Sequence, residues 1–284
     1  EKERETDGTM ANVHRLSDFR DNRAQGGGRL PGPGAQMGGP DPSDIRFIDM
    51  LCPGFSWRAM IIWISVIQAA VFIVSLSLCP PSLQLEPNPW STYILGGGIA
   101  GLTAQGQIWR LITPMFLHAN PFHILFNLFF QIRMGLPLEA KYGVSNFLYL
   151  YFVTGFMGNV FSQAVAPNGV KIGASTAGFG LIGCQIGELA LDWHMIQDKA
   201  RVILNLIFFL IIMVLMTAGM PVDWWGHLGG FVGGILMAFV LNRNMEHKPT
   251  WYKAAWWTAV AGFVAIPVSC SLKIFLGTPP IGGL

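Results

Sequence analysis

The chain has 284 residues, of which 52% are hydrophobic and only 12% are charged, and its mean hydropathy is +0.45. This composition excludes an ordinary soluble domain, because several apolar runs approach the ~20 residues that a helix needs to cross a bilayer. The formal net charge of +2 is close to neutral and gives no sign of nucleic-acid binding. The sequence therefore predicts an all-α polytopic membrane protein.

Residues 1–44 form a charged, Gly- and Pro-rich stretch with few apolar residues. Such a stretch cannot bury enough surface to offset its ordering entropy, so we predict a disordered tail. It contains no apolar segment of the kind found in secretory signal peptides, and we expect no cleaved signal here. Residues 45–58 mix apolar with charged side chains and predict a short lead-in at the membrane interface.

Seven apolar stretches follow, each close to the length of a bilayer-spanning helix. They occupy residues 59–78, 121–138, 146–166, 175–191, 201–219, 224–241 and 256–276. We predict a six-span core at residues 59–241, then a loop and a seventh span at residues 242–284. A long connection of mixed polarity separates the first two spans.

Lysine and arginine residues set the predicted orientation, because they favour cytoplasmic segments. With a cytoplasmic N-terminus, nine of them fall on the cytoplasmic side: Arg46, Arg58, Arg133, Lys141, Lys199, Arg201, Arg243, Lys248 and Lys253. Three fall on the opposite side: Arg110, Lys171 and Lys273. We therefore predict a cytoplasmic N-terminus and an outward-facing C-terminus.

Four polar residues on three spans are predicted to lie at similar depth near the outer face. His123 and Asn127 are in the second span, Ser175 begins the fourth, and His227 lies just inside the sixth. Such side chains are costly in a bilayer and usually face a cavity or one another. His123 and Asn127 are four residues apart and share a helix face, which would equally suit interhelical hydrogen bonds that hold the bundle together.

Glycines recur at four-residue intervals in the fourth and sixth spans. They are Gly183 and Gly187, then Gly226, Gly230 and Gly234, with Gly229 and Gly233 beside them. Small residues at this spacing let two helix backbones approach closely. Close packing of these two spans would bring Ser175 within hydrogen-bond reach of His227.

Two acidic residues, Asp223 and Glu188, are candidate partners of His227. Asp223 precedes it by four residues and could either contact the imidazole or cap the sixth span. Glu188 lies in the same span as Ser175 but ~20 Å further along at ~1.5 Å per residue, which is too far to orient His227.

The sequence gives no indication of a metal or cofactor. It has no H-E-x-x-H or other dense spacing of metal ligands, so we expect neither metal nor cofactor. The four cysteines, Cys52, Cys79, Cys184 and Cys270, form no C-x-x-C pair. Cys79 and Cys270 could face the same oxidising compartment, but their spacing does not establish a disulfide.

Taken in order, these motifs resemble those of the rhomboid intramembrane serine proteases over about residues 109 to 240. The motifs are Trp109-Arg110, His123 with Asn127, Glu139 with Gly143, Gly173-Ala174-Ser175, and Gly226-His227-Leu228-Gly229-Gly230 with Gly234. Five motifs in the right order are far more specific than any one of them. A seventh span after six is similar to the eukaryotic secretase-type arrangement, and the overall pattern is similar to that of apicomplexan members.

The resemblance implies a rhomboid-like six-helix core that hydrolyses peptide bonds with a Ser–His dyad. Ser175 would be the nucleophile and His227 the general base, while His123, Asn127 and the backbone N–H of Ser175 would stabilise the oxyanion. The implied partners are single-span membrane proteins within the lipid bilayer. The implied location is a secretory-pathway membrane, in the Golgi or a secretory organelle, or the plasma membrane.

One position departs from the family pattern. The family usually has glycine after the nucleophile, and this chain has Thr176, which we expect to add bulk beside the oxyanion site. Two other functions therefore stay open: a catalytically impaired rhomboid-like chaperone that binds transmembrane clients, and a small-solute transporter. Intact Ser175 and His227 disfavour the first, and the hydropathy pattern shows no inverted repeat to support the second.

Overall fold

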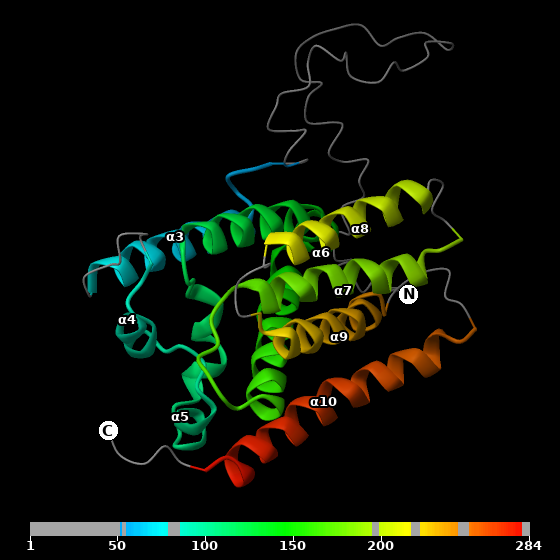
Figure 1. Cartoon of the computed structure of the whole chain (residues 1–284). Helices are drawn as coiled ribbons and strands as arrows, with labels where there is room; N and C mark the ends of the chain where they lie inside the picture. The colour runs from blue at the N-terminus through cyan, green and yellow to red at the C-terminus, as the bar shows by residue number, and fades with distance from the viewer. Residues whose placement is uncertain are drawn as a thin grey trace, which may run out of the picture. The chain divides into compact units, whose positions relative to one another are not determined.

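The structure is a computed structural model that describes residue 52 and residues 55–78, 86–194, 199–216, 222–243 and 250–279. Its elements in chain order are α3 (Met60–Leu78), α4 (Pro89–Ile94), α5 (Ala100–Ala104), η2 (Ile108–Leu111), η3 (Thr113–Phe116), α6 (Pro121–Val165), α7 (Ser175–Leu191), α8 (Lys199–Met216), α9 (Trp224–Leu241) and α10 (Tyr252–Gly277) (Figure 1). Within these ranges, the only β pairing is one isolated bridge between Gly98 and Lys171. The predicted tail, most of the lead-in and Cys79 lie outside the described residues.

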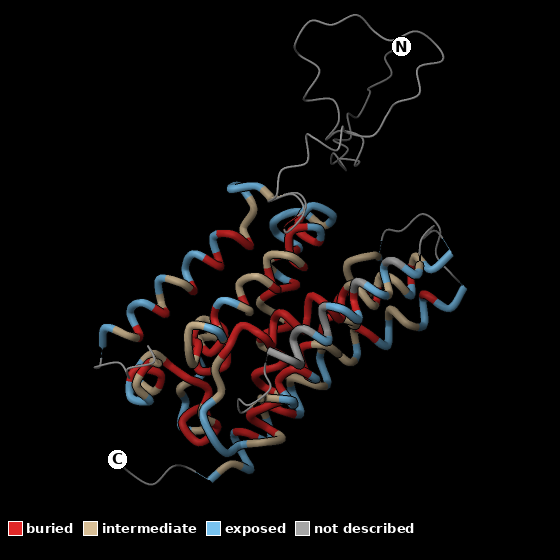
Figure 2. The backbone as a smooth tube through the Cα atoms, turned by 45° about the horizontal axis from the view of Figure 1, so that its top comes forward, coloured by how far each residue is buried: buried red, intermediate tan, exposed pale blue. Residues whose placement is uncertain are grey.

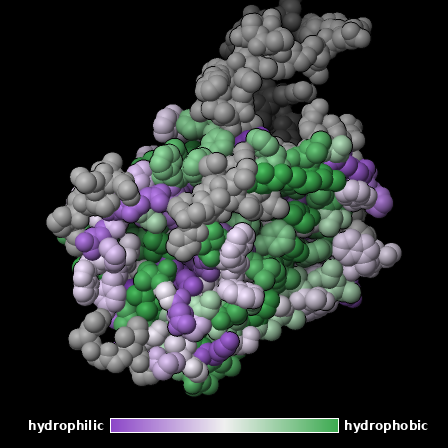
Figure 3. All heavy atoms as spheres, viewed as in Figure 1, coloured by the Kyte–Doolittle hydropathy of each residue, from purple (hydrophilic) through white to green (hydrophobic). Residues whose placement is uncertain are grey.

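The prediction of an all-α polytopic membrane protein is confirmed. Among the described residues, three helices are long and apolar enough to cross a membrane by length and composition, namely α3, α9 and α10. They correspond to the first, sixth and seventh predicted spans. Apolar side chains also cover much of the molecular face seen in Figure 3. The fourth predicted span is α7, and the described part of the fifth lies in α8.

The second and third predicted spans both lie in α6, which is two helices joined at a kink. Asn120 accepts a hydrogen bond from the His123 N–H (2.8 Å) and Pro121 occupies the first turn, so both residues favour a helix start. The kink is at Gly143, whose φ of 76° and ψ of 165° are not helical. A positive φ favours glycine, which explains this half of the Glu139–Gly143 motif.

Glu139 explains the other half of the motif, because its carboxylate caps the start of α3. One oxygen accepts the N–H of Met60 (2.7 Å) and the other accepts the N–H of Ile61 (3.0 Å). These N–H groups belong to the first turn of a helix and have no partner within it. Glu139 therefore joins α3 to α6 near the kink.

Three helices, α6, α7 and α9, form the centre of the fold, and Figure 2 shows buried residues concentrated among the packed helices. Glycines permit the close contact of α7 with α9. A Cβ on Gly230 would overlap the backbone carbonyl of Thr176, and a Cβ on Gly183 would overlap that of Phe231. The prediction that glycine spacing brings these two helices together is confirmed.

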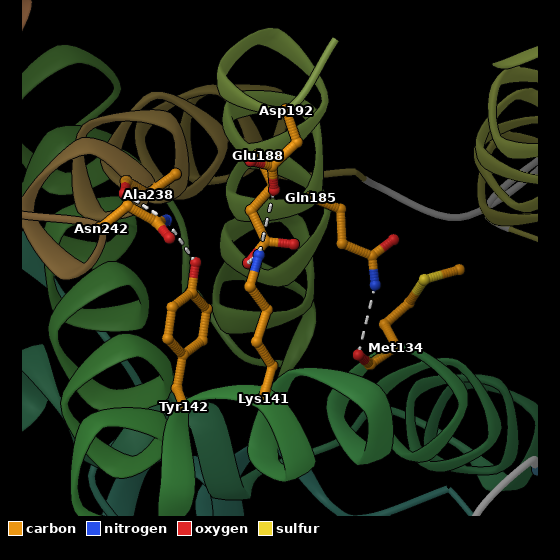
Figure 4. A network of polar contacts seen from close by, with 8 residues as sticks. All are labelled: Met134, Lys141, Tyr142, Gln185, Glu188, Asp192, Ala238 and Asn242. Carbon is orange, nitrogen blue, oxygen red and sulfur yellow. Dashed lines mark hydrogen bonds and ion pairs between the residues drawn. The ribbon is translucent and has the colours of Figure 1, made fainter. Parts of the chain in front are cut away.

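A polar cluster joins the three central helices at the end of α7 opposite Ser175 (Figure 4). Lys141, beside the α6 kink, contacts Glu188 (3.0 Å) and Asp192 (3.5 Å) on α7. The adjacent Tyr142 accepts a hydrogen bond from Asn242 at the end of α9 (2.7 Å). Burial alone would lower the pKa of Lys141, but the two carboxylates outweigh it and raise the pKa above its ordinary value.

The long connection after α3 contains the short elements α4, α5, η2 and η3, and Arg110 of η2 bonds to the part of this connection around the end of α4. Its guanidinium donates to the carbonyls of Gly97 (2.7 Å) and Tyr93 (3.0 Å) and to the Gln107 side chain (2.7 Å). Arg110 is buried, whereas the preceding Trp109 is exposed. The Trp-Arg motif therefore marks a structural arginine in this connection.

Candidate active site

Ser175 is the first residue of α7, and Gly173 lies two residues before it. The φ of Gly173 is 129°, a conformation that side chains disfavour. A Cβ at this position would also lie 3.0 Å from His123 Nε2 and 3.4 Å from Ser175 Oγ. Gly173 therefore lets the imidazole of His123 approach the loop that carries Ser175.

Ser175 and His227 meet across the contact of α7 with α9. The distance from Ser175 Oγ to His227 Nε2 is 2.8 Å, and both residues are buried. The ring of Phe179, one turn after Ser175, stacks on the His227 imidazole with centroids 4.2 Å apart and planes at 18°. This stacking restricts the imidazole to an orientation that faces the serine.

Asp223 forms hydrogen bonds with backbone N–H groups at the start of α9 and none with the imidazole of His227. Its carboxylate accepts the Gly226 N–H (3.0 Å) and the Ser162 hydroxyl (2.5 Å), and its carbonyl accepts the His227 N–H (3.0 Å). Of the two interpretations of this residue, the structure supports the helix cap. The Nδ1 atom of His227 has no hydrogen-bond partner among the described residues, so the local arrangement is a pair and not a triad.

His123 presents a donor beside the serine loop. Its Nδ1 accepts the backbone N–H of Ala119 (3.2 Å), so the neutral ring carries its proton on Nε2, the nitrogen nearest Gly173. His118 packs edge-on against this ring, with centroids 5.3 Å apart. Burial, and then the neighbouring His123, holds the pKa of His118 well below its ordinary value, so this loop histidine is neutral.

Asn127 is buried one turn further along α6 and already has one hydrogen-bond partner. Its Nδ2 donates to the carbonyl of His123 (2.8 Å) within the same helix. An amide has a second N–H and a carbonyl oxygen. This bond therefore orients the Asn127 side chain and leaves one amide N–H for another acceptor.

Thr176 packs between helices, which differs from the expectation that its bulk lies beside the oxyanion site. Its Cβ and Cγ2 lie 2.9 Å and 3.0 Å from the positions that a Cβ would take on Gly158 of α6 and Gly226 of α9. Its hydroxyl oxygen is buried without a partner in the described part of the chain. The side chain points this way because glycines on both neighbouring helices leave room for it.

Because Thr176 packs between helices, we predict that replacing it changes the stability of the protein rather than its cleavage activity. Thr176→Gly should keep cleavage activity but lower the free energy of unfolding by about 1 kcal/mol or more, through lost helix propensity and a void. Thr176→Val keeps the shape, removes the unpaired hydroxyl and should be at least as stable as the wild type. Thermal unfolding in detergent and cleavage rates test both variants. Loss of activity in a stable Thr176→Val protein would instead assign the hydroxyl to the chemistry.

Comparison with known proteins places this chain in a family. A rhomboid domain matches residues 105–244. Rhomboid-like protease 2 of Toxoplasma gondii is 41% identical over 279 residues, which cover 94% of this chain and 99% of that protein. The chain belongs to the rhomboid family. Rhomboid-like protease 1 of Toxoplasma gondii is 40% identical over 81% of this chain and 80% of its own length. RHOMBOID-like protein 1 of Arabidopsis thaliana is 38% identical over 62% of this chain and 46% of its own length.

The family assignment confirms the resemblance found in the motifs, including its similarity to apicomplexan members. Two features of the candidate site were not predicted from the sequence. Phe179 is four residues after Ser175 and on the same helix face, so its spacing could have indicated the stacking on His227. The bond between Ser162 and Asp223 depends on how α6 meets α9, and no local pattern indicates it.

Proposed function

We propose that this rhomboid is an intramembrane serine endopeptidase that uses Ser175 and His227. The observation that carries the proposal is the 2.8 Å contact between Ser175 Oγ and His227 Nε2 at a glycine-lined helix contact. A nucleophile and base within hydrogen-bond reach, with the base oriented by a further group, are the minimum for covalent catalysis. Here Phe179 stacking and the Asp223 cap serve to orient the base.

Peptide-bond hydrolysis would proceed through an acyl-enzyme. His227 Nε2 takes the hydroxyl proton as Ser175 Oγ attacks the scissile carbonyl, and then gives that proton to the leaving amine. Water, deprotonated by the same imidazole, then releases the acyl group. The developing oxyanion would receive the backbone N–H of Ser175, which lies in the first turn of α7, and the Nε2–H of His123. Asn127 supplies a third donor through its remaining N–H.

The substrates we propose are single-span membrane proteins in the same bilayer. A helical substrate must unwind locally to expose a peptide bond, so small or helix-weakening residues near the cut should be favoured. The excess of basic residues on one side supports a cytoplasmic N-terminus, with the tail 1–44 and lead-in 45–58 before a core at 59–241. The segment 242–284 would then carry the seventh span across a secretory-pathway or plasma membrane.

The test is to reconstitute the full chain in lipid vesicles with a panel of single-span substrates and a fluorophosphonate probe. The wild type should cleave at least one substrate and carry one phosphonyl adduct on Ser175. Ser175→Ala should do neither, while Ser269→Ala, which removes an exposed serine of α10, should behave like the wild type. Substrate binding without cleavage or adduct in the folded wild type would overturn the protease proposal in favour of the chaperone.

A further inference from the structure

A second polar cluster lies between α3 and α6, outside every motif named above. It consists of Ser65 and Gln68 on α3 and Gln131 and Tyr151 on the two halves of α6, all at most 5% exposed. Gln131 donates to Ser65 (2.8 Å) and Gln68 (2.5 Å), Gln68 donates to Tyr151 (2.9 Å), and Tyr151 donates to Gln131 (2.7 Å). Buried polar groups are costly unless paired, and every member of this cluster is paired.

Gln68 extends this cluster to the backbone of η3. Its Nε2 donates to the carbonyl of Met115 (2.9 Å), a residue that is fully buried. The preceding carbonyl of η3, that of Pro114, accepts the N–H of Gly173 (2.9 Å). Two consecutive carbonyls of one short helix therefore bond to α3 and to the loop that carries Ser175.

The position of η3 matters to the proposed oxyanion donors for two reasons. Gly173 contacts His123 and precedes Ser175 by two residues, so a shift of Pro114 would move both donors relative to each other. The chain leaving η3 also reaches Ala119, whose N–H fixes the tautomer of His123. Both routes begin at η3, in which the Met115 carbonyl accepts the hydrogen bond from Gln68.

We propose that Gln68 is a positioning residue for the active site. Its hydrogen bond to the Met115 carbonyl fixes η3, and η3 in turn fixes Gly173 and His123 at the distance that the oxyanion requires. Gln68 does not touch the reacting atoms. This inference rests on the proposed protease function and adds α3, which supplies neither Ser175 nor His227, to the parts of the chain that set its rate.

The test compares Gln68→Met, which keeps the volume but removes the amide, with Gln131→Leu. The second variant breaks the same cluster but leaves the bond from Gln68 to Met115, so it is the matched control. In Gln68→Met, kcat and the rate constant for fluorophosphonate labelling should fall roughly tenfold to a hundredfold with KM nearly unchanged, because small misplacements carry such costs. Gln131→Leu should stay within about twofold of the wild type in both rates, although both variants lose stability.

The rate constant and the final extent of labelling distinguish a positioning role of Gln68 from a role in folding alone. A folding defect lowers the final labelled fraction, whereas misplaced donors lower the rate constant of the molecules that do react. The proposal is overturned if Gln68→Met labels at the wild-type rate, if both variants slow equally, or if Gln68→Met gives no folded protein while Gln131→Leu folds normally. Failure of the wild type to label or cleave would instead refute the protease proposal itself.

Discussion

Replacement of His227 by alanine is expected to abolish cleavage while leaving the protein folded. The imidazole is the only base within reach of Ser175 Oγ in the part of the chain that the structure describes, at 2.8 Å. Loss of a general base typically costs ~10²–10⁴-fold in rate. The side chain packs on Phe179, so the variant also leaves a small void, but the helix cap by Asp223 uses only backbone groups of α9 and should survive.

The double variant Ser175→Ala/His227→Ala supplies the sharper measurement. Residues that act as one unit are strongly non-additive, so the double variant should be no slower than either single variant. His194→Ala, at an exposed histidine, is the matched control and should cleave at the wild-type rate. Additive losses, or retention of more than about a tenth of the activity in His227→Ala, would mean that another group serves as the base.

Much of the helical architecture could be predicted because its limits are marked by local signals. The predicted spans at 175–191 and 224–241 coincide with α7 and α9. Asp223 caps the start of α9, and Gly173, whose positive φ favours glycine, lies two residues before the start of α7. The connection before α6 was different. Its elements α4, α5, η2 and η3 are only four to six residues long, which is too short for a periodic hydrophobic pattern to indicate them. Arg110 in η2 bonds to the carbonyls of Tyr93 and Gly97, and these contacts between distant residues have no local sequence signal.

The pairing of Ser175 with His227 could be predicted because glycine spacing identifies which faces of α7 and α9 approach each other. Contacts involving α6 could not. The four-residue spacing of His123 and Asn127 marks one face of α6, but it does not fix how α3 and α7 are rotated about their own axes where they pack against α6. The direction of Thr176 and the partners of Gln68 both depend on that rotation, and each emerged only from the packed structure.

Gly230→Ala should be the most damaging single-methyl change near the site. A Cβ at Gly230 would overlap the backbone carbonyl of Thr176, directly after the nucleophile. A backbone atom cannot move aside as a flexible side chain can, so α9 must shift away from α7 at the level of the dyad. Overpacking of this kind costs about 1–3 kcal/mol of stability, and a shift near 1 Å can cost ~10²-fold in rate.

Two further glycine variants locate the cause of the Gly230→Ala defect. Gly183→Ala creates a similar overlap with the Phe231 carbonyl, but it lies eight residues along α7 from Ser175, ~12 Å away. It should lose comparable stability yet keep more kcat per folded molecule. Gly277→Ala has room, with Lys273 Cγ 3.9 Å from its Cβ, and should resemble the wild type in both respects.

The unfolding temperature in detergent measures the stability of each glycine variant, and cleavage by the folded fraction measures its kcat. Equal kcat losses for Gly183→Ala and Gly230→Ala would show that separating α7 from α9 anywhere along their contact disturbs Ser175 and His227. A wild-type kcat in Gly230→Ala would refute the idea that the close approach of α7 and α9 sets the distance between Ser175 and His227.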